Sequence, residues 1–341
     1  MLIPNSLKDL CDWQVSAMKE KHIIAYDPSN ASFNYGDRII SQSAISQLNC
    51  MMPDSMIFNF TTHTPNFEQW QKTRHNGRYR LVMDADYKFV CGSNILSNAL
   101  LRLWPNFNIN LLNKKEFKGA VLMAVGSTGQ SVMKADAYTK HLIKSTFSKD
   151  YYHSTRDEIT KEFLESLGLK AINTGCVTMW GLTPERCAGI TKTKSDSVVF
   201  TLTNERPDVQ NDTCLVQLLK NNYKKVYFCP QSAGDTEYFC SLCIDGVDLL
   251  NPDINLVSEF YKNTSVDYIG TRLHGGIYAM QHQKRSIILA VDNRAKDIDS
   301  TYNINCIARD DCDAIENKIN STFDTDVKIN IDAINQWKSQ F

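Results

Sequence analysis

The sequence lacks long apolar runs and has no marked excess of either charge. No stretch reaches the roughly 20 apolar residues that a membrane-spanning helix needs. The first ten residues, MLIPNSLKDL, have neither the basic start nor the apolar core of a secretory signal. With 37 basic and 38 acidic residues the formal net charge is -1, which argues against a nucleic-acid-binding surface that dominates the protein. We therefore expect a cytoplasmic protein without a transmembrane segment or nucleic acid partner, with peripheral association at the inner face of the membrane left open.

The number and spacing of the cysteines indicate neither a disulfide framework nor a metal site. The 11 cysteines are odd in number and irregularly spaced. Several lie in apolar runs, which is typical of buried, reduced thiols: Cys91, Cys176, Cys229 and Cys306. Cys240 and Cys243 have metal-ligand spacing, but no second pair follows. We expect these two to be helical residues packed on a core, and we expect no metal.

Apolar runs of strand length that alternate with helical patterns fill the rest of the chain. Examples are the predicted strands Val266–Gly270 and Ser286–Val291 and the predicted helix Arg156–Leu167. Such alternation predicts parallel α/β sheets with helices on both faces. The 341 residues suit two domains, and the pattern breaks near residues 180–196. We expect two doubly wound, Rossmann-like domains, residues 1–185 and 186–328, that face each other across a cleft.

The last segment, residues 329–341, is predicted to be a helix. Its apolar residues Ile331, Ile334 and Trp337 have helical spacing. We expect this helix to pack back on the first domain.

The most informative stretch runs from Val266 to Met280. It predicts a buried strand, a tight turn and a helix, with Arg272 and His274 in the turn and Gly275 just after them. The glycine lets the backbone turn closely, and the helix would aim its N–H groups and dipole at the same place. The sequence therefore predicts an anion site in which His274 can act as an acid–base group.

A second arginine that could bind an anion is Arg156. Thr155 is a good N-cap and Glu158 completes a capping box, so Arg156 is expected in the first helical turn. An arginine there opposes the helix dipole, which favours a functional reason for its presence.

Other residues at predicted strand ends have both a structural and a functional interpretation. A cap, a plain turn or a local ion pair explains each of them, and so does contact with a ligand in the cleft. These candidate substrate-binding residues are Asn34, Asp37, Gly92, Ser93, Asp235, Asp292 and Arg294, together with Gly275.

These segments together resemble the polysaccharide pyruvyl transferase family, from Asn34-Tyr-Gly-Asp37 to Asp292-Asn-Arg294. The most specific parts are Thr155-Arg-Asp157 and Gly270-Thr-Arg-Leu-His274. The resemblance implies the architecture of B-type glycosyltransferases. It also implies transfer of pyruvate from phosphoenolpyruvate onto two hydroxyls of a sugar, with release of phosphate and no cofactor.

The same resemblance implies roles for residues and domains. Arg156, Arg272 and His274 would contact phosphoenolpyruvate, and His274 would act either as the acid–base residue or as a phosphate ligand. The second domain would hold the donor, and the first would face a sugar acceptor that is lipid-linked, nucleotide-linked or an oligosaccharide. The expected pathway makes a bacterial exopolysaccharide or capsule.

Two other functions fit the same residues. A nucleotide-sugar glycosyltransferase could bind a diphosphate at Arg272 and His274, but it would leave Arg156 without an obvious role. A non-catalytic glycan-binding or assembly subunit could keep the fold, but it would have no need of all three basic residues.

Overall fold

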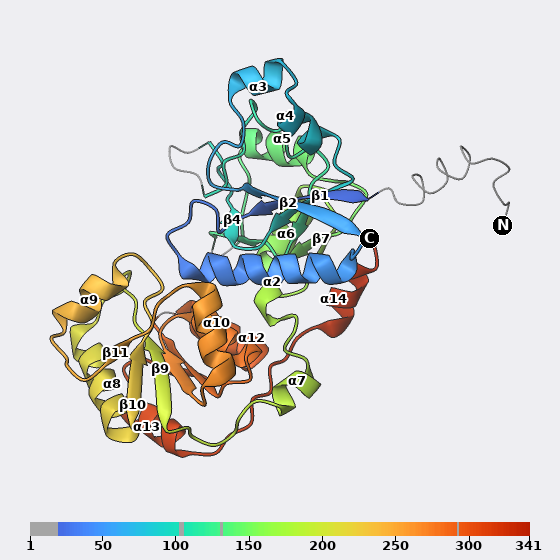
Figure 1. Ribbon diagram of the computed structural model, residues 1–341. Coiled ribbons are helices and arrows are strands. Elements are labelled where there is room, and N and C mark those ends of the chain that lie inside the picture. The colour runs from blue at the N-terminus through green and yellow to red at the C-terminus, as the bar shows by residue number, and fades with distance from the viewer. Residues whose placement is uncertain (1–19, 102–105, 130–131, 292) are drawn as a thin grey trace, which may run out of the picture.

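The computed structural model describes residues 20–101, 106–129, 132–291 and 293–341, with only the backbone course of residues 293–297. The chain forms two lobes, each built on a parallel sheet (Figure 1). Within the described ranges, no helix is both long and apolar enough to cross a membrane.

The first lobe is built on a four-stranded sheet with the order β2-β1-β3-β5, in which all pairs are parallel. Its strands are β1 (Lys21–Asp27), β2 (Ser55–Thr61), β3 (Tyr87–Cys91) and β5 (Val121–Met123). Two short parallel pairs form separate two-stranded sheets: β4 (Asn94–Leu96) with β6 (Gly126–Ser127), and β7 (His153–Thr155) with β8 (Ala171–Asn173).

The second lobe is built on a six-stranded sheet with the order β11-β10-β9-β12-β13-β14, again parallel throughout. Its strands are β9 (Ser197–Thr201), β10 (Lys225–Phe228), β11 (Asp248–Leu249), β12 (Asp267–Gly270), β13 (Ser286–Ala290) and β14 (Cys306–Ala308). Every residue of β12 and β13 is buried, because helices cover both faces of the sheet.

Helices connect the strands in both lobes. The first lobe has α2 (Tyr35–Met51), α3 (Gln69–Thr73), α4 (Gly77–Met83), α5 (Ala137–Thr146) and α6 (Glu158–Ser166). A 3-10 turn, η1 (Val177–Met179), and α7 (Pro184–Ala188) lead to the second lobe. There follow α8 (Val209–Asn222), α9 (Asp235–Ser241), α10 (Ile254–Asn263), α11 (Leu273–Gln281), α12 (Asn293–Tyr302) and α13 (Cys312–Asn320).

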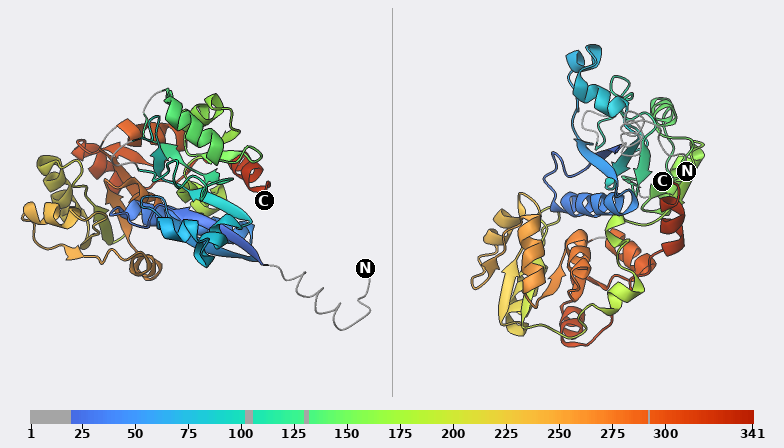
Figure 2. Two further views of the ribbon diagram at one scale, coloured as in Figure 1. Left: turned by 90° about the horizontal axis from the view of Figure 1, so that it is seen from above. Right: turned by 45° about the vertical axis from the view of Figure 1, so that its right-hand side comes forward.

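Helix α2 lies between the two lobes and packs on both (Figures 1 and 2). Its residues Ile40, Ala44 and Leu48 belong to an apolar core of the first lobe. Its residues Tyr35 and Ile39 belong to a core of the second lobe. The helix therefore fixes how the two sheets face each other.

The last helix, α14 (Ile331–Lys338), returns to the first lobe (Figure 2). The fully buried Trp337 packs edge-on against Phe89 of β3, with ring centroids 6.0 Å apart. Its Nε1–H donates to the Tyr152 carbonyl at 2.8 Å.

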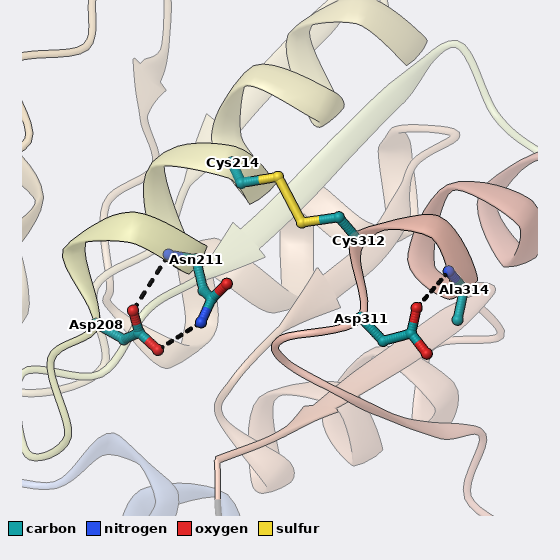
Figure 3. The surroundings of a disulfide bond; sticks show 6 residues. All are labelled: Asp208, Asn211, Cys214, Asp311, Cys312 and Ala314. Atoms are coloured by element: carbon teal, nitrogen blue, oxygen red, sulfur yellow. Dashed lines mark hydrogen bonds between the residues drawn. A yellow bond between two sulfur atoms is a disulfide. The ribbon is translucent and has the colours of Figure 1, made fainter.

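The cysteines depart from expectation in two ways. Cys214 on α8 and Cys312 on α13 form a disulfide between two capped helices, with Asp208 and Asp311 as the caps (Figure 3). The cysteines that the sequence indicated as reduced are reduced, but the sequence pattern did not indicate this pair. Cys240 and Cys243 are exposed instead of packed on a core. Across the described ranges, no group of three or more potential ligands could hold a metal ion.

Candidate active site between the lobes

A cleft of about 1120 Å³ lies between the lobes, at the ends of several parallel strands. Open parallel sheets bind ligands at the carboxyl ends of their strands. The loops after β1 and β3 contribute Asn34 and Ser93, the first turn of α2 contributes Asp37, and the segment after β7 contributes Arg156. From the second lobe, the loop after β10 contributes Gln231, the turn after β12 contributes Arg272, and the first turn of α11 contributes His274. The cleft therefore brings the three predicted basic residues together.

Arg272 is held in place by two carboxylates of different exposure. Its Nη2 lies 2.7 Å from Asp235, which is fully buried, and its Nη1 lies 2.9 Å from Glu205, whose side chain is 61% exposed. Burial acts to lower the pKa of Arg272, but the two carboxylates outweigh it and raise the pKa above its ordinary value. The guanidinium is therefore a fixed positive charge at the N-terminal end of α11.

Asp235 supports Arg272 and lies behind the cleft wall. One of its oxygens accepts the backbone N–H of Asn204 at 3.0 Å as well as the Arg272 bond, and the other accepts the N–H of Gln231 at 2.9 Å. Both oxygens are thus engaged inside the protein, and Asp235 is not among the residues that line the cleft.

His274 stands in the first turn of α11, between the first lobe and a cysteine. A Cβ added at Gly36 would lie 3.0 Å from its Nδ1, so the glycine at the start of α2 gives the imidazole room. Its Nε2 lies 3.8 Å from the sulfur of Cys176. Nδ1 therefore faces Gly36 and Nε2 faces Cys176, and neither residue belongs to the second lobe.

Arg156 reaches the cleft from a different backbone position than the sequence predicted. Helix α6 is capped by Asp157 and begins at Glu158, whereas Thr155 is the last residue of β7. The interpretation of Thr155 as N-cap, with Arg156 in the first helical turn, is therefore wrong. Pairing of Thr155 with Asn173 in the β7–β8 ladder takes precedence over its capping preference.

The side chain of Arg156 passes over Gly126. A Cβ at Gly126 would lie 2.3 Å from its Cδ, so this position must be glycine for the arginine to enter the cleft. Within the part of the chain that the structure describes, the half-buried guanidinium has no hydrogen-bond or ion-pair partner. A positive group in this setting is well placed to bind an anion.

The first-lobe wall is a network of polar side chains around the start of α2. Asn34 caps α2 by accepting the Gly36 N–H at 2.9 Å. Asp37 accepts the hydroxyls of Ser32 at 2.6 Å and Ser93 at 3.0 Å. Asn34, Asp37 and Ser93 therefore serve local structure while they line the cleft.

Two of the predicted glycines lie behind the wall. Gly92 has a positive φ of 51° and packs against Ile40, whose Cγ2 would lie 2.1 Å from an added Cβ. An added Cβ at Gly275 would lie 2.6 Å from Nε2 of Gln231 and 2.7 Å from the hydroxyl of Tyr268. Both glycines permit close packing but do not line the cleft.

The last two predicted residues are not placed in the cleft. Asp292 lies outside the described residues, and Arg294 is described only in its backbone course. Their predicted role in binding stays a prediction.

Sequence reasoning missed Glu205, Tyr302 and Cys176 as cleft residues. Cys176 is a buried free thiol, as the sequence predicts, but it also lines the cleft. The available signal was its place after a strand end, in Asn173-Thr-Gly-Cys176, where Gly175 has a φ of 73°. A glycine turn at a strand end is the same pattern that singled out Arg272 and His274.

A family model described as polysaccharide pyruvyl transferase matches residues 34–293. Among solved structures, a putative UDP-N-acetylglucosamine 2-epimerase from Listeria monocytogenes is similar with a TM-score of 0.50 at 10% identity, covering 93% of this chain and 94% of that one. A UDP-GlcNAc 2-epimerase from Methanocaldococcus jannaschii, in complex with UDP-GlcNAc and UDP, has a TM-score of 0.49 at 13% identity, covering 94% and 99%. No curated protein matches the chain. The predicted fold, two Rossmann-like domains arranged as in B-type glycosyltransferases, is confirmed.

Proposed function

Because the chain belongs to the polysaccharide pyruvyl transferase family, we propose that it moves pyruvate from phosphoenolpyruvate onto two hydroxyls of a sugar. The sugar belongs to a bacterial surface polysaccharide or to its precursor, and phosphate is released. The observation that carries the proposal is the convergence of Arg156, Arg272 and His274, from two lobes, on one cleft.

The donor suits this set of charges. Phosphoenolpyruvate carries a phosphate and a carboxylate, and each can accept paired hydrogen bonds from an arginine. Arg156 and Arg272 provide two guanidinium groups from different lobes. The N-terminal turn of α11, whose N-cap is Arg272, adds backbone N–H groups and the positive end of its dipole. A donor held between the lobes needs no metal or cofactor for its binding.

The reaction also needs a proton at the donor carbon. Protonation of the methylene carbon makes the adjacent carbon electrophilic, and the two sugar hydroxyls then add to it as phosphate leaves. His274 lines the same cleft beside Arg272, and its imidazole can donate a proton to the carbon or to the leaving phosphate. The rest of the site positions the reactants and stabilises charge.

The acceptor is proposed to lie against the first-lobe wall. Asn34, Asp37 and Ser93 present amide, carboxylate and hydroxyl groups there, which are the groups that bind sugar hydroxyls. Arg156, whose guanidinium has no partner among the described residues, sets this function apart from nucleotide-sugar transfer, for which a guanidinium on the acceptor side has no evident role.

Thermal unfolding in the presence of ligand tests the donor. A ligand at about 100 times its dissociation constant stabilises the folded protein by roughly 2.7 kcal/mol. We expect phosphoenolpyruvate to raise the melting temperature of the wild type by a few degrees, and Arg272→Ala and Arg156→Ala to abolish this rise. Arg78→Ala, an exposed arginine outside the cleft, is the control and should keep it. A rise with nucleotide sugars alone would instead establish glycosyl transfer.

We also propose that the enzyme acts in the cytoplasm at the inner face of the membrane. The segment of α3 and α4, residues 69–83, contains no acidic residue and exposes Arg74, Arg78 and Arg80, whereas its Lys72 is paired with Glu116. It lies at the end of the first lobe far from the second (Figure 1), with Trp70 54% exposed. Cationic residues beside an exposed tryptophan suit an anionic lipid surface.

Vesicle flotation tests this location. We expect binding to vesicles that contain phosphatidylglycerol and none to phosphatidylcholine vesicles. Each basic residue near such a surface contributes about 1 kcal/mol, so Arg74→Glu with Arg78→Glu should weaken binding tenfold or more. Lys262→Glu with Lys328→Glu, outside this segment, is the control. Equal binding to both vesicle types would argue against the proposal.

A further inference from the structure

Cys176 stands apart from the other buried free cysteines because it lines the cleft. Its sulfur lies 3.8 Å from Nε2 of His274 and 3.1 Å from the hydroxyl of Thr178. Cys91, Cys187 and Cys229 are also buried and free, but none of them lines the cleft. Cys176 is therefore the buried thiol placed to meet a substrate.

Several elements present charged or titratable groups to Cys176. Within the described chain these are His274 from α11, Arg156 from the segment after β7, and Tyr302 from the end of α12. The Tyr302 hydroxyl sits beside Gly175, where an added Cβ would lie 3.0 Å away. The carboxylates that line the same cleft are Asp37, Asp157, Glu158 and Glu205.

Cationic neighbours reverse the usual effect of burial on this thiol. Burial is the largest influence and raises the pKa of Cys176, but the hydrogen bond to His274, the charges of Arg156 and His274, and Thr178 together lower it to about 6. Cys91 and Cys229 have no such neighbours, and burial raises the pKa of both, to about 12 for Cys229. A thiolate beside His and Arg is a reactive, titrating group, unlike a structural buried cysteine.

We propose that Cys176 is a second acid–base residue of the transfer, acting as a thiolate hydrogen-bonded to His274 that removes a proton from an acceptor hydroxyl. The proposal rests on the proposed pyruvyl transfer. It assigns to this chain a Cys–His pair in the donor cleft.

In the proton balance of the reaction, His274 and Cys176 each transfer a proton. Protonated His274 gives its proton to the methylene carbon, which forms a C–H bond. The first hydroxyl oxygen bonds to the adjacent carbon, and its proton goes to the Cys176 thiolate. The carbon–phosphate oxygen bond breaks, and the phosphate departs with the thiol proton. The second hydroxyl then bonds to the same carbon and returns a proton to His274, so the site ends as it began.

The first test needs neither donor nor acceptor. The ultraviolet absorbance of the thiolate is titrated with pH in the wild type and in Cys176→Ser, and the difference isolates this sulfur. We expect a transition below pH 7, with Cys187→Ser, a buried cysteine outside the cleft, leaving the wild-type curve unchanged. A transition above pH 8 would overturn the inference, whether or not the enzyme transfers pyruvate.

The second test uses the reaction. General acid–base groups commonly contribute about 10²- to 10⁴-fold, so kcat of Cys176→Ser and Cys176→Ala should fall at least about 100-fold with little change in KM for phosphoenolpyruvate. The fall in kcat/KM of the wild type on acidification near pH 6 should be lost in both variants. Stabilisation by phosphoenolpyruvate verifies that each variant folds. An unchanged kcat in a folded variant would refute the role of Cys176, whereas a thiolate in an enzyme that transfers no pyruvate would refute the proposed function and this role with it.

Discussion

At the scale of single residues, Arg272 forms ion pairs with two carboxylates that differ in exposure and in role. Asp235 is fully buried, and its two oxygens also accept backbone N–H groups, so it fixes the guanidinium. Glu205 is largely exposed and occupies the other side of the same guanidinium. A substrate anion that binds Arg272 must therefore share it with Glu205 or displace it.

Glu205→Gln should improve donor binding. Removal of one exposed ion pair costs at most about 1 kcal/mol, while the guanidinium becomes available and a negative charge leaves the anion site. We expect KM for phosphoenolpyruvate to fall about threefold, with kcat nearly unchanged. Steady-state kinetics checks this, with Glu237→Gln, an exposed residue outside the cleft, as the control. A higher KM would mean that Glu205 contacts the substrate in some other way.

At the scale of elements, a buried histidine in β7 fixes the strand that leads into Arg156. His153 accepts the Leu122 N–H of β5 at 3.1 Å on Nδ1 and donates from Nε2 to the Ser148 carbonyl at 2.9 Å. Burial lowers the pKa of His153 to about 4, although the bond to Ser148 opposes this effect. The strand that leads directly into Arg156 is thus fixed by a neutral imidazole.

This histidine predicts acid sensitivity. Its pKa is depressed in the folded state, so its contribution to stability is present above the unfolded value of about 6.5 and is lost as pH falls toward 4. At about 1.4 kcal/mol per pKa unit, that loss amounts to about 3 kcal/mol. Urea unfolding at several pH values should show this decline in the wild type and in His141→Gln, an exposed control. In His153→Gln the slope should be shallower, and an unchanged slope would contradict the assignment.

Local patterns in the sequence predicted the helices and strands but not the contacts between residues that are far apart in the sequence. The strands at Val266–Gly270 and Ser286–Val291 correspond closely to β12 and β13, because continuous apolar runs mark strands that are buried on both faces. Arg272 and His274 were found because they are close in sequence. The contact of Cys176 with His274 joins residues 98 positions apart, and no local pattern encodes it.

The same limit explains the errors at turns and cysteines. Thr155 has the sequence of an N-cap, but pairing with a distant strand decides its conformation. The disulfide between Cys214 and Cys312 spans 98 residues, so spacing alone could not reveal it. Gly92 and Gly275 were recognised as special positions, but the side chains that they accommodate come from elsewhere in the chain.

At the scale of the whole molecule, the chain's last helix supports the first lobe. Trp337 of α14 is fully buried against β3 and also contacts Trp180, which lies in the connection between the lobes, with ring centroids 5.5 Å apart. Residues far apart in sequence thus share one core with α2.

Trp337→Ala should destabilise the protein strongly. Replacing a buried tryptophan by alanine costs about 3–5 kcal/mol through lost burial and the cavity left behind. Denaturant unfolding should show this loss, whereas Ile331→Ala on the same helix, 38% exposed, should cost well under half as much. A loss below about 1 kcal/mol for Trp337→Ala would indicate that α14 is not part of the cooperative core.

Helix α2 has a consequence for how the protein can be divided. Because Tyr35 and Ile39 complete a core of the second lobe while the next turns belong to a core of the first, the interior of the second lobe is completed by a helix of the first. A fragment that starts at the second sheet would leave Tyr268 and Tyr278 facing water in place of α2. The boundary visible in the sequence therefore separates two sheets but not two independently folding units, and an autonomous version of the second half would have to carry a copy of this helix.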